Sequence, residues 1–206
     1  LVRVYTNEDG TSELQPAGAE SWETSEDGLT WTFKLRKNST WSNGTPVTAH
    51  DFEYSWKRTL TPETAAEYSY IMADIVGSST KEIQENGVDG VGVKALDDYT
   101  LEVKLNRPVA YFAELVSFQV FFPQNQAFVE SCGDAYGSAA DKQLYNGPFT
   151  LTSWKMEDQF TMEKNPNYWD AANVKLNKIN TKVVKDTGAE VSLYEDGQID
   201  RAILSS

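Results

Sequence analysis

Alternating apolar and polar residues predict several β-strands in this chain. Over Leu29–Arg36, tryptophan, phenylalanine and leucine alternate with threonine, lysine and arginine, the period-two pattern of a half-buried strand. The same alternation over Val91–Leu105, interrupted by Asp97 and Asp98, predicts two strands joined by a turn. Other strands are predicted at Leu1–Thr6, at Phe149–Trp154 and Phe160–Glu163 as a hairpin, at Lys178–Val184 and at Asp200–Leu204.

Capping residues and helical spacing predict the helices. Thr48 with Asp51 three residues later is a variant of the capping box, and Phe52, Trp56 and Leu60 then share one helical face. Other helices are predicted after Thr64 with Glu67, after Ser79 with Glu82, from Pro108 to Leu115, over Gln126–Ser131, and after Thr187 with Glu190. Strands and helices mix without strict βαβ alternation, which favours an α+β (mixed α/β) fold.

Composition and charge exclude several classes of protein. The 206 residues include 18 Lys and Arg against 31 Asp and Glu, a formal net charge of −13. This acidic balance, without a basic cluster, argues against a nucleic-acid partner, because neutralising phosphates requires grouped cations. No apolar run approaches the roughly 20 residues that cross a bilayer. Cys132 is the single cysteine, so an internal disulfide and every multi-cysteine zinc pattern are excluded.

No catalytic centre is evident from the motifs. His50 adjoins Asp51, but a Gly-x-Ser-x-Gly elbow is absent and neighbouring helix residues point apart, so we expect a capping or positional role. The six residues of Gly90–Ala95 match a dinucleotide fingerprint by letter, but a strand pattern follows where a helix is required. Paired carboxylates occur only at predicted turns, where solvated acids are expected. Because glycosidase pairs can come from distant strands, a carbohydrate-active enzyme stays open as an alternative.

A long block of residues carries a resemblance to a known family. It comprises Asp27–Lys37, Trp41–Phe52 and Tyr54–Arg58. Shorter matches follow in the family's order: PETA at 62–65, VKALDD at 93–98, NGPF at 146–149, KNPNYW at 164–169 and GQID at 197–200. The chain resembles the family 5 extracellular solute-binding proteins, the oligopeptide-binding components of bacterial ABC importers. In the main block, an alternating strand, a Ser-Asn-Gly turn and a capped helix form a packing unit, so the block identifies the fold and does not mark the site.

The resemblance implies a partial periplasmic-binding-protein-like architecture of type II. Residues 1–123 would form the family's extra N-terminal α+β domain, and residues 124–206 part of the first ligand-binding lobe. The second lobe would be largely absent, so the chain is expected to be an internal fragment. Such a fragment would expose apolar surface that the missing parts cover, and self-association through that surface is expected.

The resemblance also implies a function. Members are receptors and not enzymes: they capture short peptides outside the cytoplasm, close two lobes around the peptide backbone, and deliver the peptide to the membrane permease of an ABC importer. The full-length protein would lie in the periplasm or on the outer face of the cell membrane, with a lipid anchor. Neither a cofactor nor a metal is implied. Within the family, the ligand could instead be a dipeptide, a pheromone, a nickel chelate, haem or an oligosaccharide.

Three residues are candidate ligand contacts by alignment with the family. Tyr68 matches an aromatic residue that lines the first side-chain pocket, whereas helical spacing alone would make it a core residue. Ser205 and Ser206 fall where the family has small polar residues in the cleft.

Overall fold

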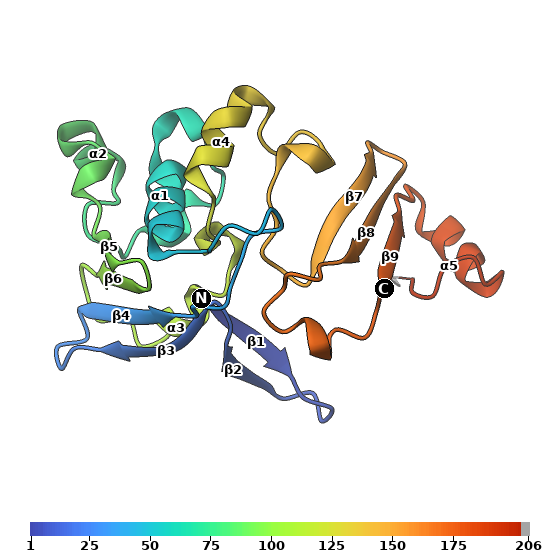
Figure 1. Cartoon of the computed structure of the whole chain (residues 1–206), viewed down its shortest axis with the longest axis horizontal. Coiled ribbons are helices and arrows are strands. Elements are labelled where there is room, and N and C mark those ends of the chain that lie inside the picture. The colour runs from blue at the N-terminus through green and yellow to red at the C-terminus, as the bar shows by residue number, and fades with distance from the viewer. Residues whose placement is uncertain (203–206) are drawn as a thin grey trace.

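The elements form two groups that follow each other along the chain, as Figure 1 shows. The first group runs from β1 to η6 (residues 2–142), and the second group runs from β7 to α5 (residues 149–195). This computed structural model describes residues 1–202, apart from the side chain of Thr187. The chain opens with an antiparallel hairpin of β1 (Val2–Thr6) and β2 (Ser12–Pro16), so the predicted first strand is confirmed. No helix within the described residues is both long and apolar enough to span a membrane.

A four-stranded antiparallel sheet forms the centre of the first group. In spatial order, its strands are β3 (Ala19–Thr24), β4 (Thr30–Leu35), β6 (Thr100–Lys104) and β5 (Val93–Asp97). On β4, Trp31, Phe33 and Leu35 are buried, and Trp31 and Phe33 lie opposite Val103 and Leu101 of β6. The period-two prediction for these strands is confirmed.

Helix α1 (Ala49–Leu60) contacts β5 and β6 of this sheet and buries its apolar face there. The predicted capping box is present: Thr48 is the N-cap and Asp51 the third residue of the helix. Phe52 and Trp56 are almost completely buried, and the Trp56 indole N–H donates to the carbonyl oxygen of Phe121 at 2.9 Å. The sequence placed this helix and its buried face correctly.

Short helices connect the sheet strands and lead into the second group. They are η1 (Pro62–Thr64), η2 (Ser69–Met72), α2 (Thr80–Asn86), η3 (Val88–Gly90), α3 (Phe112–Leu115), η4 (Gln119–Phe121), α4 (Gln126–Cys132), η5 (Gly133–Ala135) and η6 (Ala140–Lys142). The predictions for α2 and α4 are confirmed. The predicted helix after Thr64 is wrong, because Ala65 adopts a left-handed conformation (φ 48°) that ends the first turn. The predicted start at Pro108 is also wrong: Asn106 donates to the backbone oxygens of Asp74 and Ile75, residues 108–111 are irregular or in a turn, and the helix begins at Phe112.

The second group is built on a three-stranded antiparallel sheet. Its strands are β7 (Phe149–Lys155), β8 (Gln159–Lys164) and β9 (Lys178–Lys182), followed by α5 (Thr187–Glu195), with η7 (Ala171–Asn173) between β8 and β9. The predicted hairpin and third strand are confirmed. The N-cap of α5 is Asp186 and not the predicted Thr187. Asp186 Oδ1 accepts a hydrogen bond from the N–H of Ala189 at 2.8 Å. No strand forms at residues 200–202, and the rest of that predicted strand lies outside the described residues.

The buried core belongs almost entirely to the first group. All buried apolar side chains of the described residues lie between Leu1 and Val129. In the described part of the chain beyond Val129, the one buried residue is Asn165. The β7–β9 sheet and α5 therefore leave much of their apolar surface partly exposed.

Polar and cation–π contacts join the two groups at the turn of the main sequence block. The N–H of Ser42 donates to the oxygen of Tyr145 at 2.7 Å, and the Tyr145 N–H donates to Ser42 Oγ at 3.2 Å. Asn167 Nδ2 donates to the oxygen of Ser42 at 3.3 Å. The Arg36 guanidinium lies 3.8 Å from the ring centroid of Trp169. The WSNG and KNPNYW matches, distant in sequence, therefore meet in one interface.

Candidate functional site

Tyr68 lies on the surface at the start of η2, with 45% of its area exposed. Helical spacing alone predicts a buried position for this residue, and that prediction is wrong because the expected helix is replaced by a turn and a short 3-10 segment. Exposure leaves the Tyr68 ring accessible to a ligand.

Two neighbouring aromatic rings extend the exposed face of Tyr68. The Phe118 ring meets it edge-on at 5.6 Å between centroids, and the Tyr70 ring lies at 6.1 Å. Tyr70 is 67% exposed and Phe118 38%. We call these three residues the aromatic surface. Exposed aromatic rings in contact with one another provide rigid apolar area for binding. Sequence reasoning missed Phe118, because it lies in an irregular segment between α3 and η4 where no periodicity applies.

A groove of about 340 Å³ adjoins the aromatic surface. Tyr68, Phe122, Arg58, Gln124 and Glu67 are among its lining residues, so its wall combines aromatic rings, a cation, an amide and a carboxylate. Phe122 and Glu67 are exposed, whereas Arg58 and Gln124 are half-buried. These groups come from α1, η4 and the segments beside them, which the fold brings together from distant parts of the chain.

Arg58 is the charged group held most firmly in this groove. Its Nη1 donates to Gln124 Oε1 at 3.2 Å, and its Cζ lies 5.3 Å from the ring centroid of Tyr136. Burial raises the pKa of the Tyr136 phenol, which therefore stays neutral at physiological pH. The arrangement offers hydrogen bonds, apolar contact and positive charge to a ligand.

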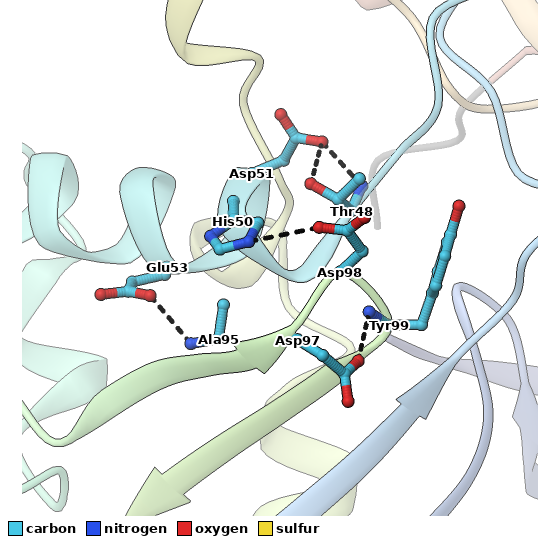
Figure 2. A network of polar contacts seen from close by, with 8 residues as sticks. All are labelled: Thr48, His50, Asp51, Glu53, Ala95, Asp97, Asp98 and Tyr99. Carbon is cyan, nitrogen blue, oxygen red and sulfur yellow. Dashed lines mark hydrogen bonds and ion pairs between the residues drawn. The ribbon is translucent and has the colours of Figure 1, made fainter.

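The paired residues His50 and Asp51 point in different directions, as Figure 2 shows. His50 Nε2 lies 3.4 Å from Asp98 Oδ1 at the β5–β6 turn, and both side chains are exposed. Asp51 accepts from the Thr48 backbone N–H at 2.8 Å instead. His50 therefore joins a helix end to a turn, which is the positional role that the sequence predicted.

Glu53 fixes α1 to the neighbouring sheet. Its Oε2 accepts from the Ala95 N–H at 2.8 Å, and its Oε1 accepts from Lys57 Nζ at 2.7 Å. Burial alone would raise the pKa of Glu53, but the bonds from Lys57 and Ala95 outweigh it and lower the pKa. This part of the main sequence block thus acts as a packing unit, as interpreted above, whereas Arg58 at the end of the block lines the groove.

Within residues 1–202, the remaining candidate residues do not assemble into a second site. The acid pairs lie exposed at turns or at the end of α5, as expected: Asp97 with Asp98, Glu157 with Asp158, and Glu195 with Asp196. Among the described residues, no group of three or more His, Cys, Asp and Glu side chains is placed to hold a metal ion. Ser205 and Ser206 lie outside the described residues.

Comparison with known proteins gives consistent matches over almost the whole chain. The model of the family described as bacterial extracellular solute-binding proteins, family 5, middle, matches residues 13–206. The oligopeptide-binding protein OppA of Bacillus subtilis is 40% identical over 202 residues, and the dipeptide-binding protein DppE of the same organism is 41% identical over 190 residues. The matches cover 98% and 92% of this chain, but only 36% and 35% of those relatives.

Solved structures agree with these sequence matches. The substrate-binding domain of an oligopeptide ABC transporter from Bacillus anthracis superposes with a TM-score of 0.91 and 47% identity, over 97% of this chain and 38% of that structure. Listeria monocytogenes OppA bound to peptide gives a TM-score of 0.90 and 42% identity, over 100% of this chain and 40% of that structure. The predicted mixed α/β fold, present only in part, is confirmed. The chain spans somewhat more than a third of the relatives it matches.

Proposed function

Because this chain belongs to the family 5 bacterial extracellular solute-binding proteins, we propose that the protein containing it captures short peptides for a membrane permease of an ABC importer. Members of this family are extracellular or periplasmic binding proteins. The observation that carries the proposal is the exposed aromatic surface at Tyr68, the position that the family resemblance assigns to a side-chain pocket. Two of the similar proteins support it: OppA of Bacillus subtilis is an oligopeptide-binding protein, and the structure of Listeria monocytogenes OppA is bound to peptide.

Recognition is proposed to occur by closure of two lobes around the peptide backbone. Main-chain hydrogen bonds would supply affinity with little dependence on sequence, as they do when a peptide is added to a strand. An apolar side chain of the peptide would then lie against Tyr68 and Phe118, where aromatic contact adds stabilisation. The groove beside them, at about 340 Å³, has room for one side chain and some water.

We assign the chain to the family's domains as predicted: residues 1–123 to the extra N-terminal domain, and residues 124–206 to part of the first ligand-binding lobe. The β3–β6 sheet and α1 fall in the first range, and the β7–β9 sheet falls in the second. We place the protein outside the cytoplasm, with a lipid anchor, and assign it no enzymatic activity, in line with the binding proteins it resembles.

Exposed apolar side chains of the second group support self-association of the 206-residue chain by itself. Met156 is 75% exposed, and Leu176, Val183 and Tyr194 are also largely exposed. Sedimentation at rising concentration should show a growing dimer fraction, since apolar patches promote association. A constant monomer mass over the whole range contradicts this part of the proposal.

Peptide capture is tested by replacing the central ring. Tyr68→Ala in the natural full-length protein should weaken binding of a mixed pool of short peptides about tenfold, near the upper limit for one aromatic contact. Tyr5→Ala, which removes a similarly exposed ring from the β1–β2 hairpin, is the matched control and should leave affinity unchanged. Calorimetric titration measures both. Equal affinity of Tyr68→Ala and the wild type would remove the aromatic surface from the binding site. The wild type binding no peptide would refute the function.

A further inference from the structure

Arg58 lies where two grooves of the first group meet. The groove of about 340 Å³ beside the aromatic surface and a second groove of about 640 Å³ along α1 share Arg58 and Thr64 as lining residues. Arg58 belongs to the last turn of α1 and is half-buried. A cation at this junction faces any ligand that occupies either groove.

Arg58 lacks the carboxylate partner that three of the other arginines have. Three arginines pair with an acid: Arg3 with Asp170 at 3.7 Å, Arg36 with Glu20 at 3.9 Å and Arg107 with Asp74 at 2.7 Å. Within the described residues, no carboxylate oxygen lies within 4.0 Å of the Arg58 guanidinium. The neighbouring Lys57 is already paired with Glu53 and Asp89. Arg58 is thus half-buried without a carboxylate partner in a chain that has 31 acidic residues.

Neutral groups hold the Arg58 side chain in place. Gln124 accepts one hydrogen bond from it at 3.2 Å, and the Gln124 backbone N–H donates to the oxygen of Asp51, which fixes that residue against α1. The Tyr136 ring lies 5.3 Å from the guanidinium carbon. These contacts orient the guanidinium and leave its charge uncompensated. A guanidinium has five N–H donors, so several remain for a ligand.

We propose that Arg58 binds a carboxylate of the peptide ligand, which makes it a specificity-determining residue. A planar guanidinium with free donors matches a carboxylate in a bidentate pair, and partial burial strengthens such a pair relative to water. The carboxylate comes either from an Asp or Glu side chain or from the C-terminus of the peptide. Glu67 lines the same groove but is exposed, and no ion pair joins it to Arg58 in the described structure. This inference rests on the proposed function.

The test uses the natural full-length protein and a set of tetrapeptides. Four peptides carry one Glu at each position of tetra-alanine, four carry Gln at the same positions, and two are tetra-alanine itself, one with a free and one with an amidated C-terminus. The wild type should bind the Gln peptide about tenfold more weakly than the Glu peptide at one position, or the amidated peptide about tenfold more weakly than the free one. Tenfold is on the order of the contribution of one charge-assisted hydrogen-bonded pair. An effect of Glu→Gln identifies a side chain as the source, and an effect of amidation identifies the C-terminus.

Variants assign that preference to Arg58. In Arg58→Met, the ratio of the affinities for the peptide with the carboxylate and the peptide without it should fall to about one. Arg58→Lys keeps the charge but loses the planar guanidinium with its paired donors, so it should retain part of this ratio. Lys94→Met removes an exposed cation outside both grooves and should change nothing. If Arg58→Met fails to fold by circular dichroism, the ratio for Arg58→Lys decides, and a ratio equal to that of the wild type overturns the inference.

Two other outcomes separate a failure of the Arg58 assignment from a failure of the proposed function. Wild-type protein that binds every peptide equally, or Arg58→Met with the full preference, overturns the assignment of Arg58 while leaving peptide capture intact. Wild-type protein that binds none of the peptides overturns the proposed function itself.

Discussion

Replacing Asp51 with alanine should destabilise the first group of elements by about 3 kcal/mol. Asp51 is buried, and its Oδ2 accepts from the Thr48 N–H at 2.8 Å and from the indole N–H of Trp41 at 3.2 Å. Trp41 is itself only 2% exposed, so water does not replace the lost acceptor easily. Leaving a buried donor without an acceptor costs about 1 to 3 kcal/mol. Two such donors, each in the lower half of that range, give the expected loss of about 3 kcal/mol.

Asparagine at the same position is the matched control. Its side-chain oxygen can occupy the place of Oδ2 and accept both bonds, so Asp51→Asn should cost less than about 1 kcal/mol. Burial is the main cause that raises the pKa of Asp51, which means that the fold disfavours the charged form. A raised carboxyl pKa lets the folded state bind more protons, so the wild type should gain stability relative to Asp51→Asn as the pH falls from neutral toward 3.8.

Urea unfolding followed by tryptophan fluorescence measures these differences, because Trp31, Trp41 and Trp56 are all buried in the affected group. For a chain of this size, the alanine variant should also melt about 6 to 12 °C lower. If Asp51→Asn is as unstable as Asp51→Ala, the charge matters and the hydrogen-bond argument is wrong. If Asp51→Ala unfolds within about 1 kcal/mol of the wild type, the buried donors are satisfied in some other way.

Three further predictions concern backbone packing, the interface between the groups, and pH. Gly77→Ala should cost about 3 kcal/mol, since φ is +71° and the new Cβ would collide with a facing backbone carbonyl. Gly44→Ala, with φ +86° but open space, should cost only about 1 kcal/mol in the same urea titration. Trp169→Ala removes the ring over which Arg36 stacks, so hydrogen exchange should speed up in the β7–β9 sheet while β4 stays protected; unchanged exchange would contradict this. Burial raises the pKa of Tyr145 to about 12, so stability should fall as the pH rises from 10.0 toward that value; a Tyr145→Phe variant with the same decline would contradict this.

The parts of the fold with clear periodicity could be predicted from the sequence. The strand at β4 alternates without interruption, and α1 combines a capping pair with an apolar face, so local and long-range preferences agree there. The segment after Thr64 shows the limit of this approach. Its capping pair predicted a helix, but Ala65 in a left-handed conformation redirects the chain, and no local pattern distinguishes the two outcomes.

The candidate site was less predictable than the fold. Family resemblance indicated Tyr68, whereas helical spacing alone placed it in the core. The contact between Phe118 and Tyr68, and the placement of Arg58 over Tyr136, join segments far apart in the chain. Such contacts depend on tertiary packing, which composition and spacing do not contain.

Native mass spectrometry of the natural full-length protein, purified without denaturation, tests the central claim most directly. Peptide capture with low sequence selectivity predicts a heterogeneous set of bound masses that fragment as short peptides, and their occupancy should decrease in the Tyr68→Ala variant. A single homogeneous mass that is not a peptide, or no bound mass even after a mixed peptide pool is added, would contradict the claim.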